Sequence, residues 1–193
     1  METVVVIVPG LGNSGEMHWQ SLWEKKFEHS IRVQQQEWLN PFCPDWIHAI
    51  EKTIEKLSDK NIFIVAHSLG CIAVAHWAQQ TKHSICGAFL VAPPDINTIQ
   101  KYNLARGFTS VPHKILPFDS ILLASTNDEY ASITIAEHYA KLWNSQFINV
   151  GAKGHINADS GFGHWPDGLA LFNIFVSDHQ LALHDKEKTW LLQ

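Results

Sequence analysis

Short runs of β-branched residues alternate with helix-like patterns along the whole sequence. Between these runs, apolar residues recur at the spacing of one face of a helix. Such alternation is typical of an α/β fold with three layers, in which a mostly parallel sheet of about six strands carries helices on both faces. The expected strands are residues 4–8, 31–36, 61–65, 87–92, 120–125 and 146–150, and the expected helices are residues 17–28, 44–57, 69–79, 133–143 and 166–176.

Three stretches stand apart from this alternation. Residues 31–36 are half polar, which favours an edge strand. Residues 93–117 hold three prolines after Pro93 and no clean periodicity, so we expect a loop with one helical turn. Residues 186–193 are expected to form a short packed or frayed tail.

Length and charge restrict the possible classes of protein. The 193 residues are enough for one well-packed domain, and we expect a single domain over residues 1–193. The formal net charge is -5, and no basic run is present that could neutralise a phosphate backbone. Nucleic acid is therefore not an expected partner.

The cysteines and the first residues indicate the compartment. Cys43, Cys71 and Cys86 are odd in number, and their spacing fits neither a disulfide framework nor a metal clamp. No basic segment precedes the first apolar run, and no apolar run is long enough to span a bilayer. We expect a soluble cytoplasmic protein without membrane insertion.

The strongest chemical signal is Ala66-His67-Ser68-Leu69-Gly70, between an expected buried strand and an expected helix of small residues. This is the setting of a nucleophile elbow, a sharp turn that needs small residues two before and two after the serine. Gly70 meets this need and Ala66 nearly does. The turn also places the backbone N–H of Leu69 where it can stabilise an oxyanion. The alternative is that Ser68 only caps the helix that follows.

An elbow serine requires an acid and then a histidine on later loops, and both are present. Asp128 follows the expected strand 120–125, and His155 follows the expected strand 146–150. The carboxyl ends of parallel strands are where an open α/β sheet binds its ligands. We therefore predict that His155 takes the proton of Ser68 and that Asp128 orients the imidazole.

Other residues compete for these roles. Asp95 also follows a strand and is the rival acid, and Asp128 itself could instead cap a helix. His164 is the rival histidine, although it lies nearer the start of the last helix than the end of a strand. Asp119 precedes its strand and would lie at the wrong edge of the sheet.

The glycine-rich turn after the first strand is the candidate for a second oxyanion donor. We expect the backbone N–H of Leu11 or Gly12 in this role. Asn13 and Ser14 either contact substrate or hold the turn. A phosphate-binding loop is the alternative, but no Gly-Lys-Ser/Thr follows.

The glycine-rich turn at residues 8–15, the elbow at residues 66–71 and the stretches around Asp128 and His155 together resemble one known family. It is the group of small serine hydrolases that includes the retinoblastoma-binding hydrolase and its bacterial relatives. The resemblance covers about residues 4–176, and the bacterial branch is the nearer one. It implies an α/β-hydrolase fold without a cap domain, and the same triad. It also implies natural substrates that are poorly defined, with some members discussed as binding proteins. Its motifs are residues 8–15, 18–20, 66–71, 125–128, 154–158 and 161–166, with Ala66 as a departure from the glycine of the general elbow.

With no room for a cap, the expected site is shallow and open, with residues 93–117 as a rim at most. This favours short acyl esters, or an acyl group carried on a bulky molecule. Trp19 and Trp165 lie in or beside loops that are expected to reach the site, and we count them as candidate substrate contacts. For Trp19 the alternative is a packing stripe with Trp23, one helical turn later.

The leading hypothesis is an esterase-like serine hydrolase that forms an acyl-Ser68 intermediate, without cofactor or metal. A second hypothesis is a protein-interaction module on a hydrolase scaffold, with activity secondary. A third, a metal hydrolase using His155, Asp159 and His164, lacks the helical spacing of such sites.

Overall fold

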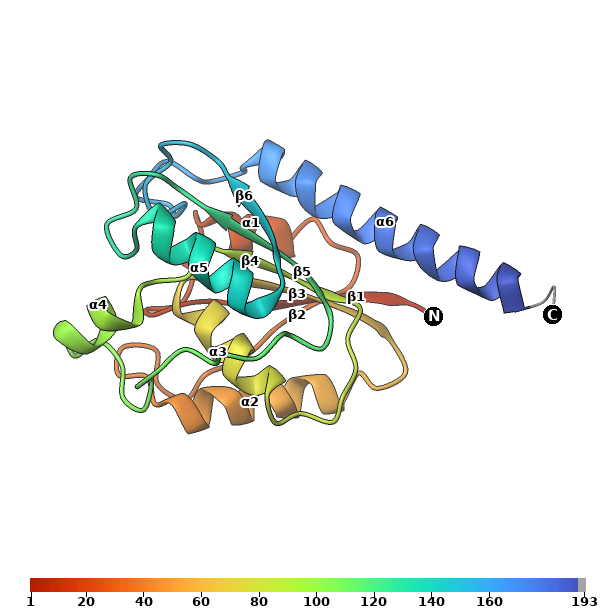
Figure 1. Ribbon diagram of the computed structural model, residues 1–193, viewed down its shortest axis with the longest axis horizontal. Coiled ribbons are helices and arrows are strands. Elements are labelled where there is room, and N and C mark those ends of the chain that lie inside the picture. Colours follow the sequence, from red (N-terminus) through yellow and green to blue (C-terminus); the bar gives the residue numbers. More distant parts are fainter. Residues whose placement is uncertain (191–193) are drawn as a thin grey trace.

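In the computed structural model the backbone is described for residues 1–190 and the side chains for residues 1–182. Six parallel strands form one sheet in the order β2-β1-β3-β4-β5-β6 (Figure 1). The predicted parallel α/β architecture is therefore confirmed. The strands are β1 (Thr3–Val8), β2 (Ser30–Arg32), β3 (Asn61–His67), β4 (Gly87–Val91), β5 (Asp119–Ala124) and β6 (Gln146–Asn149).

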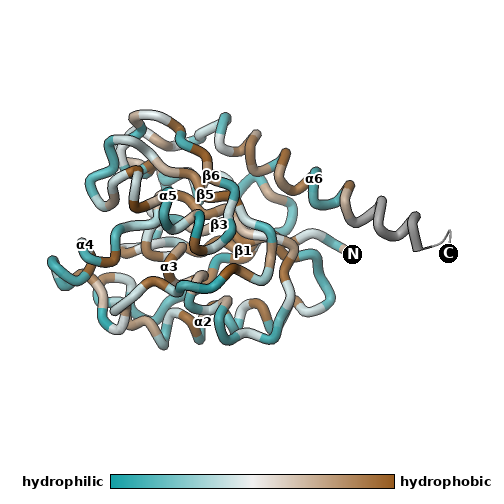
Figure 2. Tube along the Cα trace, viewed as in Figure 1, coloured by the Kyte–Doolittle hydropathy of each residue, from teal (hydrophilic) through white to brown (hydrophobic). Residues whose placement is uncertain are grey.

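Alternate residues of the strands face two separate hydrophobic cores. In β1, Val4, Val6 and Val8 belong to one core, whereas Val5 and Ile7 belong to the other. This is the period of two that a pleated strand imposes on its side chains. In Figure 2 the central strands are largely brown, the colour of hydrophobic residues, because both faces of the sheet are covered.

Helices cover both faces of the sheet. The first core includes residues of α2 (Cys43–Glu55), α3 (Leu69–Ala78) and α5 (Ile133–Trp143). The second includes residues of α1 (Trp19–Glu24) and α6 (Pro166–Trp190). These are the three predicted layers. Among the described residues, no helix has the length and apolar character needed to cross a bilayer.

The irregular segment after β4 contains one short helix, α4 (Ile96–Lys101), as the sequence predicts. It follows the carboxyl end of β4, and the chain then returns to the opposite edge of the sheet, where the parallel strand β5 begins. Two other expectations were wrong in extent. The edge strand β2 has three residues instead of the predicted 31–36. The last helix does not end at residue 176 but continues to Trp190. The expected tail 186–193 is therefore helical over residues 186–190, and residues 191–193 lie outside the described residues.

Candidate active site

The turn between β3 and α3 holds Ser68 in a backbone conformation that few residues adopt. Its φ is 53° and its ψ is -127°, and its side chain makes no capping hydrogen bond to α3. A non-glycine residue with such dihedrals costs about 1–3 kcal/mol and occurs mostly at functional sites. The helix-cap interpretation of Ser68 is therefore not supported.

The chain passes this turn closely, and glycines allow it to do so. A Cβ on Gly70 would lie 2.5 Å from the Val8 carbonyl oxygen and 2.6 Å from that of Pro9. A Cβ on Gly10 would lie 2.8 Å from Cβ of Ser68. The loop after β1 can thus lie directly against the elbow only because neither position has a side chain.

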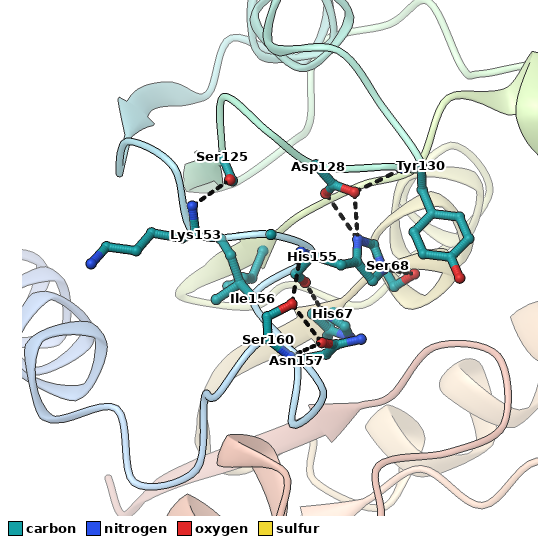
Figure 3. Close-up of polar contacts among 12 residues, drawn as sticks. His67, Ser68, Ser125, Asp128, Tyr130, Lys153, His155, Ile156, Asn157 and Ser160 are labelled. Carbon is teal, nitrogen blue, oxygen red and sulfur yellow. Dashed lines mark hydrogen bonds and ion pairs between the residues drawn. The ribbon is translucent and has the colours of Figure 1, made fainter.

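Ser68, His155 and Asp128 form a continuous chain of hydrogen bonds (Figure 3). Nε2 of His155 lies 2.8 Å from Oγ of Ser68. Nδ1 of the same ring lies 2.8 and 3.0 Å from the two carboxylate oxygens of Asp128. Because a carboxylate only accepts, Nδ1 carries the proton and Nε2 is free to accept the serine proton. The Tyr130 backbone N–H also donates to the Asp128 carboxylate.

The rival residues lie outside this chain. The Asp95 carboxylate accepts the Asn97 backbone N–H and caps α4. His164 is exposed, and its carbonyl oxygen accepts the indole N–H of Trp23. Both ring nitrogens of His155 are bonded to Ser68 and Asp128, which leaves neither available for the metal site considered with Asp159 and His164.

The backbone of His155 is held on both sides by side chains that sequence reasoning did not single out (Figure 3). Its N–H donates to Oγ of Ser160, and its carbonyl oxygen accepts from Nε2 of His67. Nearby, Ser125 Oγ accepts the Lys153 N–H, and Asn127 Oδ1 accepts the Gly154 N–H. His67, Ser125 and Asn127 lie inside the motif stretches 66–71 and 125–128, but the sequence assigned them no role, and no motif contains Ser160.

Among the described residues, two backbone N–H groups near Ser68 have no acceptor. Leu69 is the first residue of α3, so its N–H has no partner within the helix. Within the described part of the chain, no hydrogen bond occupies the Leu11 N–H either. The expectation for Gly12 was wrong, because its N–H donates to the Trp38 carbonyl oxygen, 2.9 Å away.

A buried network fixes the loop that carries Leu11. Gln20 is fully buried, and its Nε2 donates to the carbonyl oxygens of Val8 and Val65, where β1 and β3 end. Its Oε1 accepts the Ser14 hydroxyl at 2.6 Å. The placement of Ser14 in the substrate site was therefore wrong, because the residue is buried and holds the turn.

Arg32 at the end of β2 ties the same loop to α1. Its guanidinium donates to Asn13 Oδ1, the Ser14 carbonyl oxygen, Ser21 Oγ and the Glu24 carboxylate. Asn13 also lines the pocket described next, so it lies at the site but has its side-chain oxygen occupied by structural contacts.

A pocket of about 430 Å³ opens over Ser68. Its walls come from the loop after β1, from the segment after β4 and from the loop after β6. The apolar lining includes Leu11, Pro94, Ile99 and Leu104. The polar lining includes Asn13, His18, His67, Tyr130, Asn157 and Asp159.

Trp19 and Trp165 do not line this pocket, so the expectation that they contact substrate was wrong. Trp19 is fully buried and donates its indole N–H to the Ile156 carbonyl oxygen. Its ring centroid lies 4.6 Å from that of Trp23 and 5.1 Å from that of Trp165. The rings of Trp23 and Trp165 are stacked, with their centroids 5.6 Å apart. The packing stripe of Trp19 and Trp23 is the correct alternative.

Two buried histidines adjoin His155 in a row. The ring centroids of His18 and His67 are 4.8 Å apart, and those of His67 and His155 are 4.9 Å apart. Burial lowers the pKa of His18 to about 4, with smaller contributions from the charges of Arg32 and His155. Burial also holds the pKa of His67 well below its usual value. Both rings are therefore neutral at neutral pH.

Comparison with known proteins places this geometry in context. A family model described as "Serine hydrolase" matches residues 5–174. YdeN of Bacillus subtilis, which is named as a hydrolase, is 25% identical over 177 residues that cover 86% of this chain and 92% of YdeN. The YdeN structure superposes with a TM-score of 0.77 at 23% identity, covering 92% of this chain and all of YdeN.

Two further solved structures are similar. A YdeN-like hydrolase from Pectobacterium atrosepticum has a TM-score of 0.82 and is 33% identical, with 92% of each chain covered. Est1E from Butyrivibrio proteoclasticus, solved with ferulic acid bound, has a TM-score of 0.63 at 10% identity and covers 94% of this chain and 88% of its own. At that identity Est1E shows a shared fold alone.

Proposed function

This chain belongs to the serine hydrolase family, and from that premise we propose that it hydrolyses acyl esters through a Ser68-His155-Asp128 triad. The observation that carries the proposal is the unbroken hydrogen-bond chain from the Ser68 hydroxyl to the Asp128 carboxylate. A strained serine against a neutral, oriented imidazole is an activated nucleophile.

In the first half of the reaction, Oγ of Ser68 attacks the carbonyl carbon of the ester while its proton passes to Nε2 of His155. The carbonyl π electrons move to its oxygen, which becomes an oxyanion. Asp128 stabilises the imidazolium that forms and keeps the ring in place. When the oxyanion collapses, the bond to the alcohol oxygen breaks, and His155 returns its proton to that oxygen. The product is an acyl-Ser68 ester and a free alcohol.

In the second half, His155 takes a proton from water, and the hydroxide oxygen attacks the acyl carbon. The bond to Ser68 Oγ breaks, the proton of His155 returns to Oγ, and a carboxylic acid leaves. We propose the backbone N–H groups of Leu69 and Leu11 as the donors to the oxyanion in both halves. Leu69 directly follows Ser68, and Leu11 directly follows Gly10, which packs against Ser68, and this supports the assignment.

The pocket supports a small acyl-bearing substrate. The segment after β4 contributes Pro94, Ile99 and Leu104 as a rim and adds no covering domain, so either the acyl group or the alcohol can extend into solvent.

The three cysteines are all free thiols, which supports the proposal of a reducing, cytoplasmic compartment.

The proposal is tested by labelling with a fluorophosphonate, which reacts only with an activated serine. We expect labelling of the wild type, none in Ser68→Ala, and strong reduction in His155→Ala. Asp128→Asn should lower kcat on p-nitrophenyl butyrate by about 10⁴-fold, because the wrong tautomer of the imidazole is then favoured.

Matched controls separate the triad from general damage. Asp95→Asn and His164→Ala change the rival acid and the rival histidine, and both should keep labelling and kcat near wild type. A folded wild type without labelling would overturn the proposal, and loss of activity in Asp95→Asn alone would reassign the acid.

The alternative is a protein-interaction module, for which tryptophans exposed beside the site would supply a docking surface. Trp19 is fully buried and Trp165 packs against Trp19 and Trp23, so these side chains do not supply a docking surface over the pocket.

A further inference from the structure

His18 lines the pocket, and its two ring nitrogens differ in their surroundings, since one is bonded to the backbone and the other is buried without a partner. It is the N-cap of α1, and its Nδ1 accepts the Gln20 backbone N–H. An acceptor nitrogen carries no proton, so in the neutral ring the proton is on Nε2. The cap therefore makes His18 Nε2–H a hydrogen-bond donor.

This donor is buried and has no acceptor. The side chain of His18 lines the pocket with only 6% of the residue exposed. Nε2 makes no hydrogen bond anywhere in the part of the chain with described side chains. An unpaired buried donor costs free energy, and in native proteins such a group usually has a functional explanation.

The neighbouring His67 does not relieve it. Nε2–H of His67 donates to the His155 carbonyl oxygen. Among the described residues, no hydrogen bond joins the rings of His18 and His67. Burial lowers the pKa of His18 to about 4, so the ring stays a neutral, single donor at neutral pH.

We propose that His18 is a specificity-determining residue whose Nε2–H donates to an acceptor oxygen of the bound ester, separate from the carbonyl that Ser68 attacks. The inference rests on the proposed esterase function. It names the substrate class as esters that carry an ether, hydroxyl or carbonyl oxygen within a few bonds of the scissile group, in place of plain alkyl esters.

The mixed lining of the pocket supports this assignment. Ile99 and Leu104 form an apolar surface that suits the hydrocarbon part of an ester. The polar lining includes His18, Asn13 and Asn157, and Asn13 Oδ1 already accepts from Arg32 and the Ser14 N–H. A hydrocarbon group bound against His18 would leave its N–H unpaired, whereas an oxygen would satisfy it.

Two variants separate the donor from the cap. In His18→Asn, the amide oxygen can still cap α1, since asparagine is a favoured N-cap, but nothing reaches the position of Nε2. In His18→Gln, the longer amide brings an N–H near the position of Nε2 and loses the cap geometry instead. If His18 only caps α1, His18→Asn should behave like wild type and His18→Gln should be impaired. If His18 is a donor to substrate, His18→Asn should change the substrate selectivity and His18→Gln should preserve it.

The experiment compares kcat/KM for substrate pairs that differ by one ether oxygen in place of a methylene. The acyl pair is p-nitrophenyl methoxyacetate and p-nitrophenyl butyrate, and the alcohol pair is 2-methoxyethyl acetate and butyl acetate. For each pair, the ratio in a variant is divided by the ratio in wild type, so that the intrinsic reactivity of the esters cancels. The pair that responds shows which part of the ester faces His18.

We expect His18→Asn to lower the oxygen-over-methylene ratio of one pair by about three- to tenfold, the usual effect of one hydrogen bond between neutral groups. His18→Gln should restore that ratio to near the wild-type value. If neither ratio changes in His18→Asn while the fluorophosphonate still labels Ser68, the inference is wrong and the esterase proposal stands. If the wild type is not labelled, the proposed function itself fails.

Discussion

Gly70 shows how a single residue can decide whether the nucleophile turn forms. A methyl group there would meet two carbonyl oxygens of β1 and its loop at 2.5 and 2.6 Å, and both oxygens belong to the backbone and cannot move aside freely. Overpacking of this kind destabilises a fold by about 1–3 kcal/mol or more.

We therefore expect Gly70→Ala to lower the free energy of unfolding by at least that amount and to abolish fluorophosphonate labelling. Urea unfolding at pH 7 measures the first effect. Gly15→Ala is the matched control, because a Cβ there meets nothing within 4 Å, and its stability should stay near wild type. Equal stability of the two variants would contradict the packing explanation.

The three residues of the proposed triad could be named from the sequence because strand order and motif order are both visible in it. Their hydrogen bonds could not, since they depend on loop geometry. Gly12 and Ser14 show what the sequence could not predict. The Gly12 N–H is bonded to Trp38, which is distant in sequence, and the Ser14 hydroxyl is bonded to Gln20, which lies on α1.

At the scale of elements, the short edge strand β2 has more influence on the site than its length suggests. It ends in Arg32, whose guanidinium joins the loop after β1 to α1 through four residues. The Arg32–Glu24 ion pair is largely shielded, with the Arg32 side chain 11% exposed.

Arg32→Met should therefore loosen the loop that carries Leu11. We expect a loss of about 1.5–3 kcal/mol in the free energy of unfolding, typical of hydrogen bonds to a charged group, and a fall in kcat that exceeds any change in KM. Arg106→Met removes an exposed arginine that bonds Asn40 and serves as the control, with both quantities near wild type. A normal kcat in Arg32→Met would show that the loop keeps its shape without it.

The element pattern was predictable wherever a segment is buried on a periodic face. The four central strands fall where β-branched runs predict them, because both faces of the sheet are covered there. The exposed edge strand β2 overlaps its predicted range only at residues 31 and 32. The last helix was cut short at residue 176 because its apolar periodicity fades there. Directly after that point Ser177, Asp178 and Gln180 are exposed polar residues, and His179, which packs against Phe63, is not apolar, so the sequence shows no apolar helix face there.

At the scale of the whole molecule, buried neutral histidines couple stability to pH. Burial lowers the pKa of His18 to about 4, of His67 well below the usual value, and of His76 more modestly. In the unfolded chain these rings bind protons below about pH 6.5. Between pH 6.5 and 4 the unfolded state therefore holds more protons than the native state, and stability falls as the pH is lowered.

We expect the free energy of unfolding, measured with urea, to decrease steadily from pH 6.5 to 5. In His67→Asn the slope between pH 6 and 5 should be smaller by about one proton, or about 1.4 kcal/mol per pH unit. Identical slopes in wild type and variant would mean that His67 is not held neutral in the fold.

The packed indoles of Trp19, Trp23 and Trp165 have an optical consequence. Their centroids lie 4.6–5.6 Å apart, which is close enough for exciton coupling between the three indole rings. Trp19 is also bonded to the carbonyl of Ile156, the residue after the histidine of the proposed triad. The protein thus carries an intrinsic chromophore attached to its reactive loop, and circular dichroism in the ultraviolet would register a movement of that loop without any added dye.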